Sequence, residues 1–267
     1  MKFVSLDIPR ARLEGRRVVI VGSGPGVLDN DDGFIDGHDV VIRVNNYRLS
    51  SEAGFRCDIF YSFFGNSIRK TRDELAHDGV TLCICKCPNA HAIQSEWHRR
   101  HGLMAGVDFR WIYAKRAGWW FCDTYLPEPA EFMTVFEMLG GHVPTTGFSA
   151  IQFVLGCKPA ALHLTGFDFF RSGIHNVTEH WGEKNIGDPI GHVPEVELQW
   201  LRDHLFDHPI TCDPRLMRAL ARRKHERRTE QSDVPIQRHD LSGVPQNGQR
   251  VPLHRAPRRA FLPRHRH

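Results

Sequence analysis

Short apolar runs rich in β-branched residues alternate with longer stretches of mixed polarity over the first 221 residues. Such runs predict buried strands, and the stretches between them predict helices or irregular connections. Strands are expected at residues 17–22, 38–44, 57–61, 80–86, 109–113, 161–166 and 209–212, and helices at 67–77, 127–140 and 148–156. The alternation predicts an α/β fold with a doubly wound, mostly parallel sheet flanked by helices.

The first predicted strand runs directly into a glycine turn. Four β-branched residues lead to Gly22, Ser23 and Gly24, where the backbone can approach a ligand closely. The dinucleotide-binding fingerprint requires a third glycine three residues after Gly24, and Val27 stands there instead. This departure disfavours a nicotinamide cofactor.

The next predicted strand ends in polar residues. Asn45 can donate to and accept from a base or a ribose, although turn residues after a strand have the same sequence signature. Arg43 stands near the point where NAD-binding folds place an acidic residue. Because an arginine can accept a 2′-phosphate, NADP binding stays open as an alternative.

A second glycine turn precedes a predicted helix. Thr145, Thr146 and Gly147 offer short hydroxyl groups and free backbone N–H groups, which attract an anion at a helix start. The strand that follows this helix ends in Thr165 and Gly166. The pattern suits a nucleotide phosphate and sugar, and it also fits an ordinary helix cap followed by a strand.

Two histidines are candidates for proton transfer. His192 precedes a predicted helix that has Pro194 and Glu197 in its first turn, and Glu197 is near enough in sequence to orient the histidine ring. His180 is a candidate donor to a leaving phosphate. The chain has 17 histidines, so a structural or surface role for each of the two stays open.

Together these segments resemble the motifs of the sialyltransferases of glycosyltransferase family 29. The large motif is matched by Gly22-Ser-Gly-Pro and Ile35-Asp-Gly-His-Asp-Val-Val-Ile-Arg-Val-Asn45, and the small motif by Pro144-Thr-Thr-Gly-Phe and Leu162-His-Leu-Thr-Gly-Phe. The third motif is similar to His180-Trp181, and the very small motif to His192 with Glu197. The four matches follow the family order over residues 16–205. The bacterial family 42 sialyltransferases are similar over the same residues.

The resemblance implies an inverting transfer of sialic acid, or a related nonulosonic acid, from its CMP ester to a hydroxyl group of a glycan or glycolipid acceptor of bacterial type, such as lipopolysaccharide. It also implies that residues 1–221 form a sialyltransferase-like glycosyltransferase domain. This would be a single Rossmann-like nucleotide-binding domain of a GT-A-type variant, with no metal or other cofactor. His192 would be the general base, and His180 would assist departure of the CMP phosphate. The residues implied in donor binding are Gly22, Ser23, Gly24, Asn45, Thr145, Thr146, Gly147 and Gly166.

Three departures from the family pattern matter. The disulfide that joins the large and small motifs in the animal enzymes cannot form, because Val18 stands opposite Cys157. Phe170 replaces the tyrosine that touches the phosphate in family 42. The motifs also leave the sugar open, so a CMP-Kdo-dependent transferase and a nucleotide-binding protein with degenerate chemistry are the alternatives.

The charge of the chain is divided unevenly. Residues 222–267 have a net charge of +8 and the rest −4, so a basic, disordered tail is predicted after residue 221. Such a tail could hold the protein against anionic lipid, whereas the preceding part has no basic stripe that indicates nucleic acid. Without an N-terminal apolar stretch, and with Cys83, Cys85 and Cys87 interpreted as reduced thiols, a cytoplasmic location is expected. The acidic turn at Asp29 and Asp31 is interpreted as a loop and not as a metal clamp.

Overall fold

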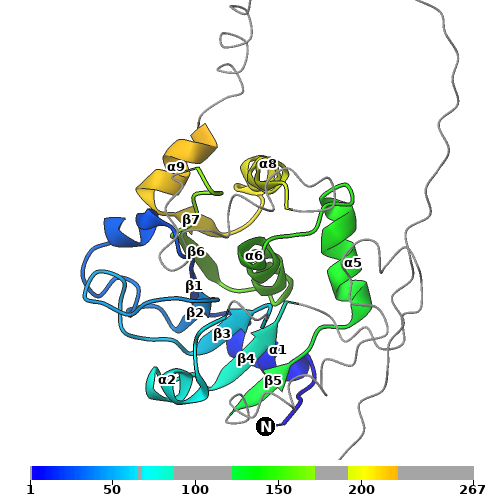
Figure 1. Cartoon of the computed structure of the whole chain (residues 1–267). Coiled ribbons are helices and arrows are strands. Elements are labelled where there is room, and N and C mark those ends of the chain that lie inside the picture. Colours follow the sequence, from blue (N-terminus) through cyan, green and yellow to red (C-terminus); the bar gives the residue numbers. More distant parts are fainter. Residues whose placement is uncertain (1, 65–67, 87–121, 172–191, 222–267) are drawn as a thin grey trace, which may run out of the picture. The chain divides into compact units, whose positions relative to one another are not determined.

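The computed structural model describes residues 2–64, 68–86, 122–171 and 192–221. Their framework is a seven-stranded sheet of order β5-β4-β3-β2-β1-β6-β7, in which every neighbouring pair is parallel (Figure 1). The strands are β1 Arg17–Val21, β2 Val40–Val44, β3 Ile59–Ser62, β4 Leu82–Cys85, β5 Asp123–Tyr125, β6 Ala161–Thr165 and β7 Ile210–Cys212. The predicted α/β fold with its parallel sheet is confirmed.

Helices cover both faces of this sheet. They are α1 Asp7–Leu13, the 3-10 helix η1 Pro25–Asp29, α2 Arg72–His77, α5 Pro129–Met138, α6 Thr146–Gly156, α8 Pro194–His204 and α9 Pro214–Ala221. Six of the seven strands and the helices α2, α5 and α6 fall within or beside predicted ranges. The strand predicted at 109–113 lies outside the described residues, whereas β5 was not predicted.

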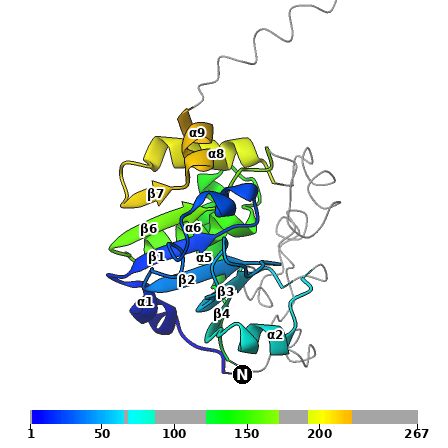
Figure 2. The same cartoon turned by 90° about the vertical axis from the view of Figure 1, so that its left-hand side faces the viewer.

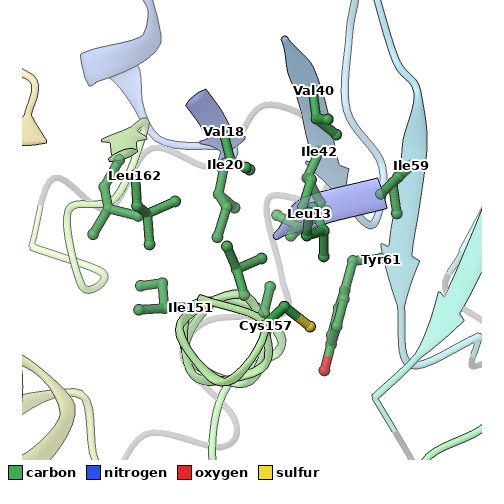
Figure 3. Packing of buried hydrophobic residues seen from close by; sticks show 14 of the residues in the cluster. Leu13, Val18, Ile20, Val40, Ile42, Ile59, Tyr61, Ile151, Cys157 and Leu162 are labelled. Atoms are coloured by element: carbon green, nitrogen blue, oxygen red, sulfur yellow. The ribbon is translucent and has the colours of Figure 1, made fainter. Parts of the chain in front are cut away.

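Alternate residues of the strands point to opposite faces of the sheet. On one face, Ile20 and Ile42 pack with Ile151 of α6 and Leu13 of α1 (Figure 3). On the other face, Val19 and its neighbours pack against η1 and the chain that leads into β2. Because both faces are covered, the central strands contain short runs of apolar residues, such as Val18–Val21 of β1 and Val40–Ile42 of β2, which is why sequence patterning located them.

The order of the strands creates a switch point beside β1. The chain moves outward from β1 through β2, β3, β4 and β5, and then returns so that β6 pairs with the other side of β1. Val21 and Thr165 are register partners at the ends of β1 and β6. In open α/β sheets the loops at such a point separate, and ligands bind beyond the carboxyl ends of the strands. Figure 2 shows β1 between β2 and β6 from the side.

The chain divides by its contacts into two units, Met1–Arg223 and Lys224–His267. The second unit lies outside the described residues, so the disorder and membrane association expected for the tail stay predictions. No helix among the described ranges is both long and apolar enough to cross a bilayer.

Candidate functional site

The glycine turn after β1 interlocks with the turn after β6. The N–H group of Gly22 donates to the Thr165 carbonyl at 2.8 Å, and that of Gly24 donates to the Gly166 carbonyl at 2.8 Å. A Cβ atom at Gly22 or Gly24 would collide with the Gly166 carbonyl oxygen, and Gly166 itself has a φ of +74°. Only glycine allows this approach of two backbones, so these three residues are required by the packing of the two turns.

This packing limits how the first turn can meet a phosphate. The N–H groups of Gly22 and Gly24 are committed to carbonyl groups of the β6 turn. Ser23 lies between them and is half-buried. Its hydroxyl and N–H group bind no other residue in the described part of the chain, so they are the potential donors of this turn. The predicted contact of the turn with CMP therefore stays a prediction that depends on Ser23.

Sequence reasoning missed the residue that fixes these turns, Asp213. Its buried carboxylate accepts hydrogen bonds at 2.8 Å from the N–H groups of Gly166 and of Leu216 in the first turn of α9. A Cβ atom at Gly26 would collide with the same carboxylate. Asp213 precedes Pro214 at the start of α9, a typical N-cap signal that could have identified it.

The start of α6 is joined to the start of α8 by a buried carboxylate. Thr145 caps α6, because its hydroxyl oxygen accepts a hydrogen bond at 3.1 Å from the Phe148 N–H group. Thr145 also donates to Glu197 of α8, from its N–H group at 2.5 Å and from its hydroxyl at 2.8 Å. Gly147, in the same turn of α6, is needed because a Cβ atom there would strike the Phe167 ring. Thr146 is buried.

His192 lies against the same turn. Its Nδ1 atom is 2.8 Å from the Val143 carbonyl oxygen. A carbonyl oxygen can only accept, so Nδ1 has the proton in the neutral ring and Nε2 has the lone pair. The expectation that Glu197 orients this ring is wrong, because the Glu197 carboxylate is bound to Thr145 and the Val143 carbonyl holds His192.

Burial shifts both ionisable groups of this turn. It lowers the pKa of His192 to about 4, and the positive charge of Lys86 adds to that effect. It raises the pKa of Glu197 to about 7, against the hydrogen bonds from Thr145 and the charge of Lys86. Lys86 is 8% exposed and directly follows β4. His192 is thus neutral at physiological pH, as a general base must be.

Asn45 lies at the carboxyl end of β2 with a left-handed φ of 50°. The Ser62 hydroxyl donates to Asn45 Oδ1 at 3.0 Å and accepts from the Phe64 N–H group. This bond fixes the amide orientation and leaves Nδ2 without a partner among the described residues. The predicted role of Asn45 as a donor to a nucleotide is therefore chemically open to it.

Other residues of the large motif have structural roles. The buried Arg43 guanidinium donates at 2.7 Å to the carbonyl groups of Arg56 and Ala53, so it is unavailable to a 2′-phosphate. Asp36 accepts from the N–H groups of Phe55 and Arg56, and Asp39 binds Arg17. Arg43 was the feature of the sequence that kept NADP binding open, so this alternative is no longer supported.

The other sequence features weighed for the site are His180-Trp181 and the acidic turn at Asp29 and Asp31. His180 and Trp181 lie outside the described residues. Asp29 pairs with Arg215 at 2.7 Å. Within the described part of the chain, no group of three or more histidine, cysteine or acidic residues could hold a metal ion.

The structure is similar to those of sialyltransferases. A mammalian sialyltransferase in complex with Gal-β-1-3GalNAc-ortho-nitrophenol shares 17% identity, with 79% of this chain and 73% of that chain covered and a TM-score of 0.45. CstII from Campylobacter jejuni with the substrate analogue CMP-3FNeuAc shares 16% identity, with 74% and 81% covered and a TM-score of 0.46. No family model and no curated protein matches the sequence. A likeness this distant carries no argument about activity, which has to come from this chain's own residues.

The carboxylate of Asp213 gives a test of the turn architecture. Replacing Asp213 with alanine leaves the N–H groups of Gly166 and Leu216 unpaired in a buried place, so we expect the free energy of unfolding to fall by about 2–4 kcal/mol. Urea unfolding measures this change, with Asp207→Ala at an exposed position as the matched control. A loss no larger than that of the control would contradict the role assigned to Asp213.

The buried Glu197 predicts a pH dependence of stability. Its pKa is raised from 4.5 to about 7 on folding, so its stabilising contribution is complete below about pH 4.5 and is lost as the pH rises through 7. The lowered pKa of His192 has the opposite effect, because it makes the protein more stable as the pH rises from about 4 to 6.5. The comparison is the difference in unfolding free energy between wild type and Glu197→Gln. We expect this difference to decrease by up to about 3 kcal/mol as the pH rises from 4.5 to 7.5. A difference that does not change with pH would disprove the shift.

Proposed function

We propose that this chain is an inverting, metal-independent glycosyltransferase that moves sialic acid, or a related nonulosonic acid, from its CMP ester to a hydroxyl group of a glycan or glycolipid acceptor. One observation carries the proposal. Two separate contacts, from His192 to Val143 and from Glu197 to Thr145, bring the His-x-x-x-x-Glu segment against the Pro-Thr-Thr-Gly turn. Two segments that are about 50 residues apart in sequence, and that match two of the resembled motifs, thus lie together.

The state of His192 suits it to act as the base. The carbonyl of Val143 fixes the tautomer, so Nε2 can take the proton of an acceptor hydroxyl as that oxygen attacks the anomeric carbon of the donor. An imidazole whose pKa is about 4 is a weak base in the free protein. The phosphate and carboxylate of a bound CMP-sugar would raise this pKa by offsetting the charge of Lys86. Donor binding would then strengthen the base before the acceptor reacts.

The negative charge that develops on the departing CMP phosphate also needs stabilisation. The N–H groups of Thr146 and Gly147 open α6, an 11-residue helix whose start favours negative charge. Ser23 and Asn45 offer neutral donors from the ends of β1 and β2, and His180 is proposed to protonate or hydrogen-bond the phosphate. Donors of this kind make a cation unnecessary, which is why we propose metal-independent transfer.

The base assignment is tested by the rate of transfer. We expect His192→Ala to reduce turnover by about 10²–10⁴ and to leave CMP affinity nearly unchanged, because the base acts in the transition state and not in donor binding. CMP release from CMP-sialic acid is measured with EDTA present, using as acceptor Gal-β-1-3GalNAc-ortho-nitrophenol, the compound bound by the mammalian sialyltransferase.

The exposed His77 provides the matched control, since His77→Ala should turn over as wild type does. Turnover of His192→Ala close to that of wild type would end the assignment of the base. Activity that disappears in EDTA and returns with Mg²⁺ or Mn²⁺ would end the proposal of metal independence.

A further inference from the structure

Two cysteines outside the candidate site lie in contact. Cys83 is in β4, and Cys122 directly precedes β5; their Sγ atoms are 3.5 Å apart. Cys83 is 1% exposed, whereas Cys122 is only half-buried. The two thiols are therefore close enough to react with each other.

The two thiols are chemically unequal. The hydrogen bond between them lowers the pKa of Cys122 because it stabilises the Cys122 thiolate. The same bond, together with burial, raises the pKa of Cys83. The thiolate is the nucleophile in cysteine oxidation, so Cys122, which is also the more accessible, reacts first.

We propose that Cys83 and Cys122 are a modification site at which a peroxide forms an intramolecular disulfide. The Cys122 thiolate attacks one peroxide oxygen, the O–O bond breaks, and a sulfenic acid forms on Cys122 as hydroxide leaves. The Cys83 sulfur then attacks the Cys122 sulfur and displaces its hydroxyl group, which takes the Cys83 proton and departs as water. Two thiols are oxidised to one disulfide, and one hydrogen peroxide is reduced to two water molecules.

Closing the disulfide requires a movement at Cys122, which lies just outside the ladder of β4 and β5. A disulfide needs an S–S distance of about 2.05 Å, so the two sulfurs must approach by roughly 1.5 Å. In the parallel ladder of β4 and β5 the first pair is Leu82 with Asp123, so Cys122 lies just before the paired residues. A shift at Cys122 can thus bring the thiols together without breaking that ladder.

The test uses the full chain treated with hydrogen peroxide. Peptide mass mapping without reductant should show Cys83 joined to Cys122, and dithiothreitol should restore both thiols. Before oxidation, iodoacetamide should modify Cys122 at least about tenfold faster than Cys83. The Cys83→Ser variant should stop at a sulfenic acid on Cys122 that dimedone captures, whereas Cys122→Ser should give no adduct on Cys83.

Cys212→Ser is the matched control, because Cys212 is also half-buried but lies in β7. Its removal should leave the link between Cys83 and Cys122 unchanged. A disulfide from Cys122 to another cysteine, or no intramolecular disulfide, would overturn the proposal. Faster alkylation of Cys83 than of Cys122 in the wild-type chain would overturn it even if the serine variants failed to fold.

Discussion

The candidate site depends on the buried carboxylate of Glu197. It accepts both the N–H and the hydroxyl of Thr145, and so it holds the first turn of α8 against the first turn of α6. His192 precedes α8, and its imidazole lies at the same turn because it contacts the Val143 carbonyl. Burial of a carboxyl group is unfavourable unless its hydrogen bonds are made, which couples the geometry of the turn to its stability.

The second constraint is the contact between the turns after β1 and β6. The glycines that first indicate a phosphate loop are explained by the close packing of the two backbones. The Asp213 carboxylate stabilises this packing by accepting a hydrogen bond from the Gly166 N–H group. The interlocked turns leave Ser23 exposed in part at the switch point of the sheet. A sequence motif can thus mark a ligand site because it builds the scaffold around that site, while only some of its residues are free to touch the ligand.

The apolar pattern predicted the strands because a parallel sheet covered on both faces needs consecutive apolar residues, as in the Val-Val-Ile segments of β1 and β2. It missed β5, a three-residue edge strand with the sequence Asp-Thr-Tyr, which has little apolar pattern to detect. The family resemblance identified His192 and the Thr145 turn as candidates, and the structure shows that they lie together. The true partner of Glu197 could not be predicted, because Thr145 is 52 residues away and local spacing favours His192.

Titration calorimetry of the purified chain with CMP, CDP, UDP and NADP tests most directly whether this edge of the sheet is a CMP-sugar site. We expect CMP to bind, and the other three nucleotides to bind at least about tenfold more weakly. An Asn45→Ala variant should lose part of the CMP affinity, because the Nδ2 group of Asn45, at the end of β2, has no hydrogen-bond partner among residues 2–64, 68–86, 122–171 and 192–221. Binding of NADP or UDP in preference to CMP would contradict the assignment.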